Sequence, residues 1–530
     1  MALRINFNAE STVTHTALLR NERAMNKSLL RISTGQRILS AADDAAGLFI
    51  SDQLSVVAAA LEQGNRNIQT GISALQIAET NVGQIFEKLQ TIYTKAQSAA
   101  NDINDPNARS AIQRDIQNII DAIQKLGTDT EYNGIKLLDG TFSDKVIHYG
   151  ARAEQTITVG IESVKANDLG ANMVIGGGPL SYAVAASAVA GSSVNNGYTA
   201  TTGAVVTGTA WRYDTGDQAT VAGINVGGQL VFAVDAKAIA NGINSSTTLQ
   251  NLGITARATN SSTATAEWTD IQTSTGQSVT IKFFVGSDST ADITVTVGEN
   301  SVLTLTDLVT KINTQASANN KNITAKIESG KLVLVTEGET IGLEVSVSAA
   351  ASYGTVTVNM AQFMGLSAAT VNVLANAGTA GASATGSAIR VGKLVIMGVD
   401  DFTYNFTGIS TASEGLGVAP TGGSTFKNLY SIDVTNNPNA ELALDIVKTA
   451  LQKTDKIRTQ IGSVINNLQA IWDGQKASYD NTKEAENIIR NTDFAAEMSN
   501  FVTMQIRMQS GVAMLAQANA LPQLVLQLLR

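Results

Sequence analysis

The stretch LSVVAAALEQGNRNIQTGISALQIAETNVGQIFEKLQTIYTKA, at positions 54–96, carries the strongest structural signal in this chain because its apolar residues keep a seven-residue spacing. The seam consists of Leu54, Leu61, Ile68, Leu75, Val82, Leu89 and Ala96. A heptad seam of this length predicts one long helix that packs against other helices. At 1.5 Å per residue the helix spans about 60 Å, the length of a rod rather than of a compact domain. Gly64 and Gly71 lie in the neighbouring seam, and we interpret them as points where two helices approach closely.

The composition excludes several classes of function. The 530 residues carry a formal net charge of −9 and include no cysteine, which excludes disulfides, thiolate metal sites and cysteine nucleophiles. The acidic balance argues against a nucleic-acid partner, which needs a concentrated positive field. With two isolated histidines and no metal-binding or nucleotide-binding motif, we expect no metal site, no catalytic residue and no cofactor. No uninterrupted run of about 18 apolar residues occurs, so we expect no membrane insertion.

Helical patterns occupy both ends of the chain, and strand patterns occupy its middle. An amphipathic segment runs from Val13 through Leu39, with Gly35 as an interruption, and a second long seam begins near Asn437. Because both ends are helical, they must come together and leave the middle as an insertion. The sequence therefore predicts an α+β multidomain protein. Its core is a long antiparallel helical bundle, or coiled coil, built from both chain ends, with β-rich variable outer domains inserted in the middle.

Shifts in composition place the domain boundaries. We expect residues 1–46 and 490–530 to form terminal helices with a linker, and residues 47–175 and 430–489 to form a helical rod with a β-hairpin patch. Residues 176–429 are expected to form a surface-exposed β-rich region.

Local signals refine this picture. Pro106 predicts the start of a return helix and Gly127 its end, and the Asn-Gly pair in TEYNGIKLLDG, at positions 130–140, predicts a hairpin turn. In the middle region, Ile243-Asn244 followed by GITAR resembles Ile312-Asn313 followed by NITAK. The repetition predicts a duplicated β-α-β-β module.

Three segments resemble the bacterial flagellins. They are RISTGQRILSAADDAAGLFISDQL at 31–54, the TEYNGIKLLDG turn, and DFAAEMSNF at 493–501 with MLAQANALPQLVLQLLR at 514–530. The resemblance implies a subunit that polymerises head to tail into the flagellar filament for bacterial motility, with the terminal helices lining an inner tube. The inner-tube contacts would be Leu18, Met25, Ile32, Phe501, Met508 and Leu515, and the rod seam would be Leu54, Leu61, Ile68, Leu75, Val82 and Leu89. The alternatives are a hook–filament junction protein and a surface adhesin on a helical stalk.

The resemblance also implies partners and a location. The partners would be other copies of the chain, the flagellar cap, hook-associated proteins, and an export chaperone at the C-terminal helix. The protein would be extracellular and exported unfolded without a cleaved signal peptide, with terminal helices that are disordered in the monomer. The flagellin-sensing Toll-like receptor reads a segment that corresponds here to Gln90, Thr91, Tyr93 and Lys95. Both family arginines are missing from it, at Thr91 and Tyr93, so we expect poor receptor activation.

Overall fold

The computed structural model describes residues 8–101, 103–198 and 210–528, so residues 1–7 and 529–530 of the predicted terminal domain lie outside the described part. The chain divides into two compact units. The first contains Met1–Thr80, Glu131–Glu162 and Thr459–Arg530, and the second contains Asn81–Thr130 and Ser163–Arg458. The helical ends and the β-rich middle confirm the predicted α+β fold class.

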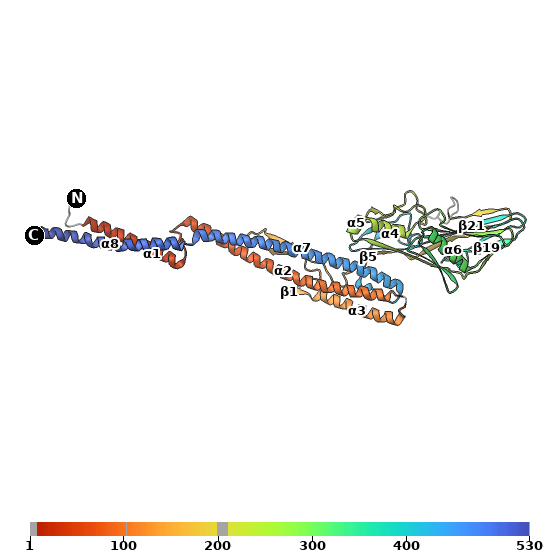
Figure 1. Ribbon diagram of the computed structural model, residues 1–530, viewed down its shortest axis with the longest axis horizontal. Coiled ribbons are helices and arrows are strands. Elements are labelled where there is room, and N and C mark those ends of the chain that lie inside the picture. The colour runs from red at the N-terminus through yellow and green to blue at the C-terminus, as the bar shows by residue number, and fades with distance from the viewer. Residues whose placement is uncertain (1–7, 102, 199–209, 529–530) are drawn as a thin grey trace. The chain divides into compact units, whose positions relative to one another are not determined.

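The first and last helices of the described part of the chain lie side by side in the first unit (Figure 1). α1 (Ala9–Thr34) starts after Asn8, whose side chain accepts a hydrogen bond from the Ser11 amide. It ends at Gly35, which adopts a left-handed φ of 72°. The predicted interruption at Gly35 is therefore confirmed, and Leu39 lies in the linker beyond it. α8 (Phe494–Leu528) follows a short break after α7 (Asn437–Arg490).

α2 (Ala45–Ala99) is one uninterrupted helix, which confirms the prediction from its heptads. The Asp44 carboxylate accepts a hydrogen bond from the Gly47 amide at 2.9 Å and so caps the helix start. By length and composition alone α2 is apolar enough to cross a membrane, a test that the core helix of a water-soluble protein also passes.

The interpretation of Gly64 and Gly71 as close helix–helix contacts is wrong. A Cβ at Gly64 would lie 2.1 Å from the backbone oxygen of Tyr149, and a Cβ at Gly71 would lie 2.5 Å from Cδ1 of Ile147. The helix α7 reaches Gly71 only at an ordinary contact distance, 3.9 Å to Cδ1 of Leu468. Ile147 belongs to β3 (Lys145–His148), which pairs antiparallel with β4 (Thr156–Val159). The glycines therefore let a β-hairpin approach α2, since their missing side chains leave room for it.

α3 (Pro106–Asp129) starts as predicted, with the Asp105 side chain accepting a hydrogen bond from the Ala108 amide at 2.7 Å. Its predicted end at Gly127 is wrong, because the helix continues to Asp129. Gly127 is buried inside the last turn, where a Cβ would lie 3.0 Å from Cα of Lys165. Close packing therefore explains this glycine. After α3, the Asn-Gly turn joins β1 (Glu131–Tyr132) to β2 (Ile135–Lys136), as predicted.

The second unit contains the β-rich region. One antiparallel sheet has the order β16 (Ile323–Glu328), β17 (Lys331–Thr336), β11 (Thr255–Thr263), β22 (Lys393–Gly398), β5 (Gly170–Ile175), β25 (Thr425–Asn428). Another has the order β14 (Ile293–Val297), β13 (Gln277–Val285), β18 (Ile341–Ala349), β21 (Ala382–Val391), β6 (Leu180–Val184), with β8 (Ser193–Asn195) parallel to β21. One smaller sheet has the order β19 (Thr355–Asn359), β20 (Asn372–Asn376), β7 (Ala186–Ala188). Another has the order β10 (Ile224–Asn225), β9 (Thr220–Val221), β23 (Thr403–Asn405), β24 (Thr421–Gly423). A two-stranded sheet pairs β12 (Ile271–Gln272) with β15 (Val302–Leu303).

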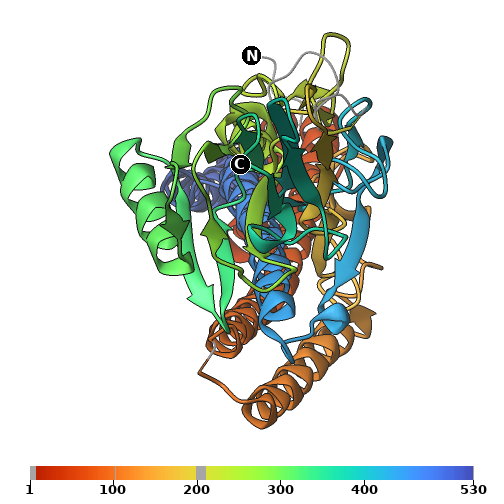
Figure 2. The same cartoon turned by 90° about the vertical axis from the view of Figure 1, so that its right-hand side faces the viewer.

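Short helices accompany these sheets: α4 (Ala236–Ser245), α5 (Thr247–Asn251), α6 (Leu305–Ala318), and the 3₁₀ turns η2 (Met360–Gln362) and η3 (Leu429–Ser431). Figure 2 shows α6, the light-green helix, lying alongside neighbouring green strands. Its Leu308, Ile312 and Ala316 are buried in an apolar cluster with residues of β13, β14 and β18. The β-rich region thus has an apolar core of its own.

The two repeated segments have the same helix–strand structure. The Asn244 side chain in α4 donates to the oxygen of Ala256 and accepts from its amide, at 2.8 and 2.9 Å. Asn313 in α6 makes the same pair of bonds to Ala325, at 2.9 and 2.8 Å. Each asparagine side chain therefore satisfies the main-chain amide and carbonyl groups that a neighbouring strand would otherwise bind.

The strands that follow the two repeats differ. In the second copy β16 pairs with β17, which comes directly after it, so these two strands form the last part of the predicted β-α-β-β module. In the first copy β11 pairs instead with β17 and β22, which both come much later in the chain. The prediction of two complete β-α-β-β modules is therefore wrong for the first copy.

Candidate assembly surfaces

Polar bonds set the antiparallel register of α1 and α8. The side-chain amide of Asn8 donates to the oxygen of Ala518 at 2.9 Å, and that of Asn21 donates to the oxygen of Met504 at 3.0 Å. The first bond joins the start of α1 to Ala518 in the later part of α8, and the second joins the middle of α1 to Met504 in the earlier part of α8. The two ends of the chain therefore form one antiparallel helical pair.

The six residues predicted as inner-tube contacts are all half-buried: Leu18, Met25, Ile32, Phe501, Met508 and Leu515. Those on α1 alternate with Asn21 and Ser28, whose side chains bond to α8. A Cβ at Gly511 would lie 3.0 Å from Cδ1 of Leu18, which shows how closely the helices approach. Within one chain these six side chains therefore belong to the seam between α1 and α8, and their role in polymerisation stays a prediction.

A second set of apolar residues on these helices is uncovered, and the heptad pattern did not reveal it. The exposed fractions range from 39% at Leu19 to 69% at Val13. The members are Val13, Leu19, Leu29, Leu30, Phe494, Met498, Val502, Ile506, Val512 and Met514. Among the described side chains of α1 and α8, up to residue 520, only Ser28 and Ala518 are buried. A pair with so small a core and so much apolar surface is typical of an association surface.

Hydrogen bonds join the linker that follows α1 to the end of α7. The Arg37 amide donates to the oxygen of Arg490 at 2.7 Å, and its guanidinium donates to the oxygen of Ile489 at 3.2 and 2.6 Å. These bonds satisfy carbonyls that the last turn of α7 leaves free. The Asp43 carboxylate contacts Lys27 at 2.5 Å, and this hydrogen bond lowers the pKa of Asp43.

The predicted rod seam is largely internal to the chain. Its buried members are Leu61, Ile68, Leu75, Val82 and Leu89, and Leu54 is half-buried. Nearer its start, α2 exposes Phe49, Ile50 and Val56, whose exposed fractions are 66%, 48% and 66%. The first turns of α2 therefore add to the uncovered apolar surface of the first unit.

The predicted receptor segment lies near the end of α2. Gln90 and Thr91 are exposed, and Tyr93 and Lys95 are half-buried. The Thr91 hydroxyl donates to a main-chain oxygen of its own helix at 3.0 Å, and the Lys95 amine pairs with Asp115 of α3 at 3.1 Å. The cation of this segment is therefore already paired within the chain.

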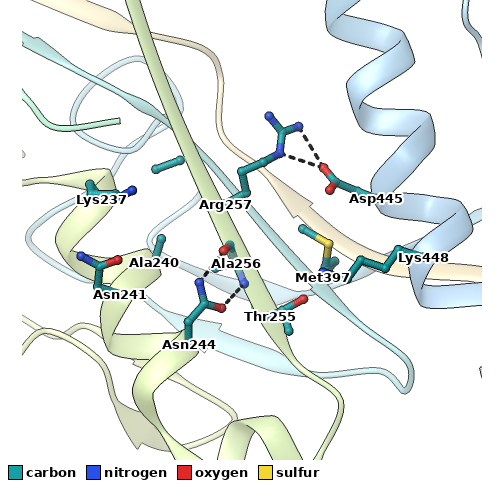
Figure 3. A pocket seen from close by; sticks show the side chains of 11 residues that line it. Lys237, Ala240, Asn241, Asn244, Thr255, Ala256, Arg257, Met397, Asp445 and Lys448 are labelled. Atoms are coloured by element: carbon teal, nitrogen blue, oxygen red, sulfur yellow. Dashed lines mark hydrogen bonds and ion pairs between the residues drawn. The ribbon is translucent and has the colours of Figure 1, made fainter. Parts of the chain in front are cut away.

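A polar cavity of about 400 Å³ lies between α4, β11 and α7 in the second unit (Figure 3). Arg257 points toward Asp445: its Nε and Nη2 donate to Oδ2 of Asp445 at 3.0 and 2.9 Å, and its Nη1 donates to Glu441 at 2.9 Å. Burial raises the pKa of Asp445, and the Arg257 charge opposes that shift. The lining residues include no histidine, and the one carboxylate among them, that of Asp445, is held by Arg257.

Comparisons with known proteins identify the family. Residues 5–143 match the bacterial flagellin N-terminal helical region, and residues 444–529 match the bacterial flagellin C-terminal helical region. A flagellin from Aquifex pyrophilus is 51% identical over 531 residues, and one from Aquifex aeolicus is 50% identical over 547 residues; both matches cover 100% of each chain. Among solved structures, FliC from Burkholderia pseudomallei matches at 14% identity with a TM-score of 0.28, covering 75% of this chain and 99% of that chain.

Paired terminal helices with an uncovered apolar surface are typical of a structural subunit. The full-length matches give the family: the chain belongs to the flagellins. It is a structural subunit of the flagellar filament, an extracellular appendage. The junction-protein and adhesin alternatives are not favoured, because the full-length relatives are flagellins.

Proposed function

We propose that this subunit polymerises through the uncovered apolar residues of α1 and α8, and that these helices become stably folded only on assembly. The small core of the pair supports the proposal, because Ser28 and Ala518 are the only buried residues among its described side chains up to residue 520. Burial of apolar surface by neighbouring copies would supply about 25 cal/mol per Å², which the isolated pair lacks. The six seam residues would then hold the pair together inside the tube.

Amide exchange in the monomer and in the filament tests this proposal. We expect fast exchange over residues 9–34 and 494–520 in the free subunit and slow exchange in the filament, with the β-rich region protected in both states. Leu515→Ala should abolish filaments and leave the β-rich region folded, since truncation of a packed leucine costs about 2–5 kcal/mol. Slow exchange of both segments in the monomer would refute folding on assembly.

The proposal extends to the remaining partners. The cap and the hook-associated proteins would contact the same terminal helices at the ends of the filament, and an export chaperone would cover α8 before assembly. The exposed apolar side chains of Met498, Val502 and Ile506 support this role, because a chaperone would shield them from water before assembly. Export would occur without a cleaved signal peptide, so mass spectrometry of filament protein should find the N-terminal segment intact. A protein shortened by a leader would contradict this part.

We also propose that the subunit activates the flagellin-sensing receptor poorly. Exposed Thr91 and half-buried Tyr93 stand where arginines would supply bidentate contacts, and Lys95 is paired with Asp115. Thr91→Arg combined with Tyr93→Arg should raise signalling in a reporter-cell assay at least about tenfold. Thr70→Arg, at an exposed threonine elsewhere on α2, should leave it unchanged. Strong signalling by the unmodified subunit at low dose would refute the proposal.

A further inference from the structure

The helical pair formed by α1 and α8 has two different sides. One side is hollowed by an open groove of about 850 Å³. The residues that line it include Val13, Ala17 and Arg20 of α1 and Arg507, Gly511 and Met514 of α8. Residues three, four or seven positions apart share one side of a helix, so each of these sets belongs to a single side. We call this side of the pair the groove face.

The opposite side of the pair carries exposed apolar side chains and an acidic one. Two positions along a helix correspond to a rotation of about 200°, which places Leu19 and Glu22 of α1 opposite Ala17 and Arg20. By the same spacing, Val512 of α8 lies opposite Met514. Leu19, Glu22 and Val512 are all exposed. We call the side that these three residues define the back face.

The charges on the two faces are complementary. Arg20 and Arg507 line the groove, and within the described part of the chain neither has an ion pair. Glu22 on the back face also has no ion pair among the described residues. The bond from Asn21 to the oxygen of Met504 sets the level along the pair: Arg20 and Glu22 flank Asn21, and Arg507 lies about one turn from Met504. The three charges therefore lie within about one helical turn of one another along the pair.

We propose that the groove face of one subunit receives the back face of a second copy, with Glu22 of the second copy facing Arg20 and Arg507. Two different faces of one molecule make a heterologous contact, which repeats without closing on itself and so builds a helical polymer. Apolar side chains of the back face, such as Leu19 and Val512, fill the apolar lining of the groove. The carboxylate and the two guanidinium groups fix the register, since rim charges set specificity more than affinity. The pairing rests on the proposed polymerisation through α1 and α8.

Charge reversal on each face tests the pairing. Full-length subunits carrying Arg507→Glu or Glu22→Arg are polymerised and assayed by sedimentation and electron microscopy. Each single variant should give at least about tenfold less sedimentable polymer than the parent, because like charges then meet across the contact. An equimolar mixture of the two single variants should regain polymer, since each altered groove face then finds an altered back face. Glu328→Arg makes the same charge change at an exposed position of β16 and should polymerise like the parent.

The outcomes separate this pairing from the proposal on which it rests. Failure of the parent subunit to polymerise overturns polymerisation through α1 and α8. If the parent polymerises, single variants that assemble normally overturn the pairing. A mixture that stays unassembled, while circular dichroism shows parental helix content in both variants, overturns it as well, because the groove then receives some other segment.

Discussion

Substitution of alanine for Gly64 isolates the contact between α2 and the β3–β4 hairpin. An alanine Cβ would lie 2.1 Å from the oxygen of Tyr149 and 2.6 Å from its carbonyl carbon, both backbone atoms that no rotamer change can move. The hairpin must therefore shift, and this shift would break the hydrogen bond that the Asn67 side-chain amide donates to the main-chain oxygen of His148 at 3.0 Å. Overpacking of this kind costs about 1–3 kcal/mol, and the lost bond adds about 1 kcal/mol. The higher helix propensity of alanine offsets about 0.5–1 kcal/mol, which leaves a net loss of about 1–3.5 kcal/mol.

Two other glycines of α2 provide matched controls. A Cβ at Gly71 would clash only with the flexible end of Ile147, at 2.5 Å, so Gly71→Ala should change stability by less than about 1 kcal/mol. A Cβ at Gly83 would meet nothing within 4 Å, so Gly83→Ala should stabilise the helix by about 0.5–1 kcal/mol. Urea unfolding followed by circular dichroism measures the series, and amide exchange reports on the hairpin itself. Stabilisation by Gly64→Ala equal to that by Gly83→Ala would refute the close approach.

Three further predictions concern the second unit. Asn313→Ala removes both bonds to Ala325 and should cost about 1–3 kcal/mol, seen as faster exchange in β16; unchanged exchange would show that water replaces the side chain fully. Burial raises the pKa of Asp235 from 3.8 to about 6. The protonated carboxyl group of Asp235 therefore contributes about 3 kcal/mol of stability, which is fully present below pH 3.8 and is lost as the pH rises through 6. Asp235→Asn should flatten that part of the stability–pH curve in urea titrations, and a curve of parental slope would contradict the assignment. Arg257→Met leaves the carboxylate of Asp445 buried without its partner, so the free energy of unfolding in urea should fall by about 1–3 kcal/mol. Arg66→Met removes the cation of an exposed ion pair and is the control. An equal fall in the control would show that the burial is irrelevant.

Local signals in the sequence were sufficient for several elements. Heptad spacing predicted α2, because a continuous seam from Leu54 to Ala96 can face partners only if the helix is unbroken. The Asn-Gly turn between β1 and β2 and the proline at the start of α3 were also predictable, since each acts through its own backbone conformation. Segments shared with the flagellins supplied the family, which no spacing rule could have given.

Tertiary packing settles which partner each surface meets. Gly64 resembled a helix–helix contact in sequence, but its neighbour is Tyr149 of a hairpin far along the chain, which no local pattern encodes. Heptads likewise aligned Leu18 and Leu515 without showing that the seam joins α1 to α8 within one chain. Only the packed pair reveals which apolar residues remain uncovered, such as Val13 and Met514. Periodicity fixes the side of a helix on which a residue lies, whereas burial depends on what the rest of the chain brings to that side.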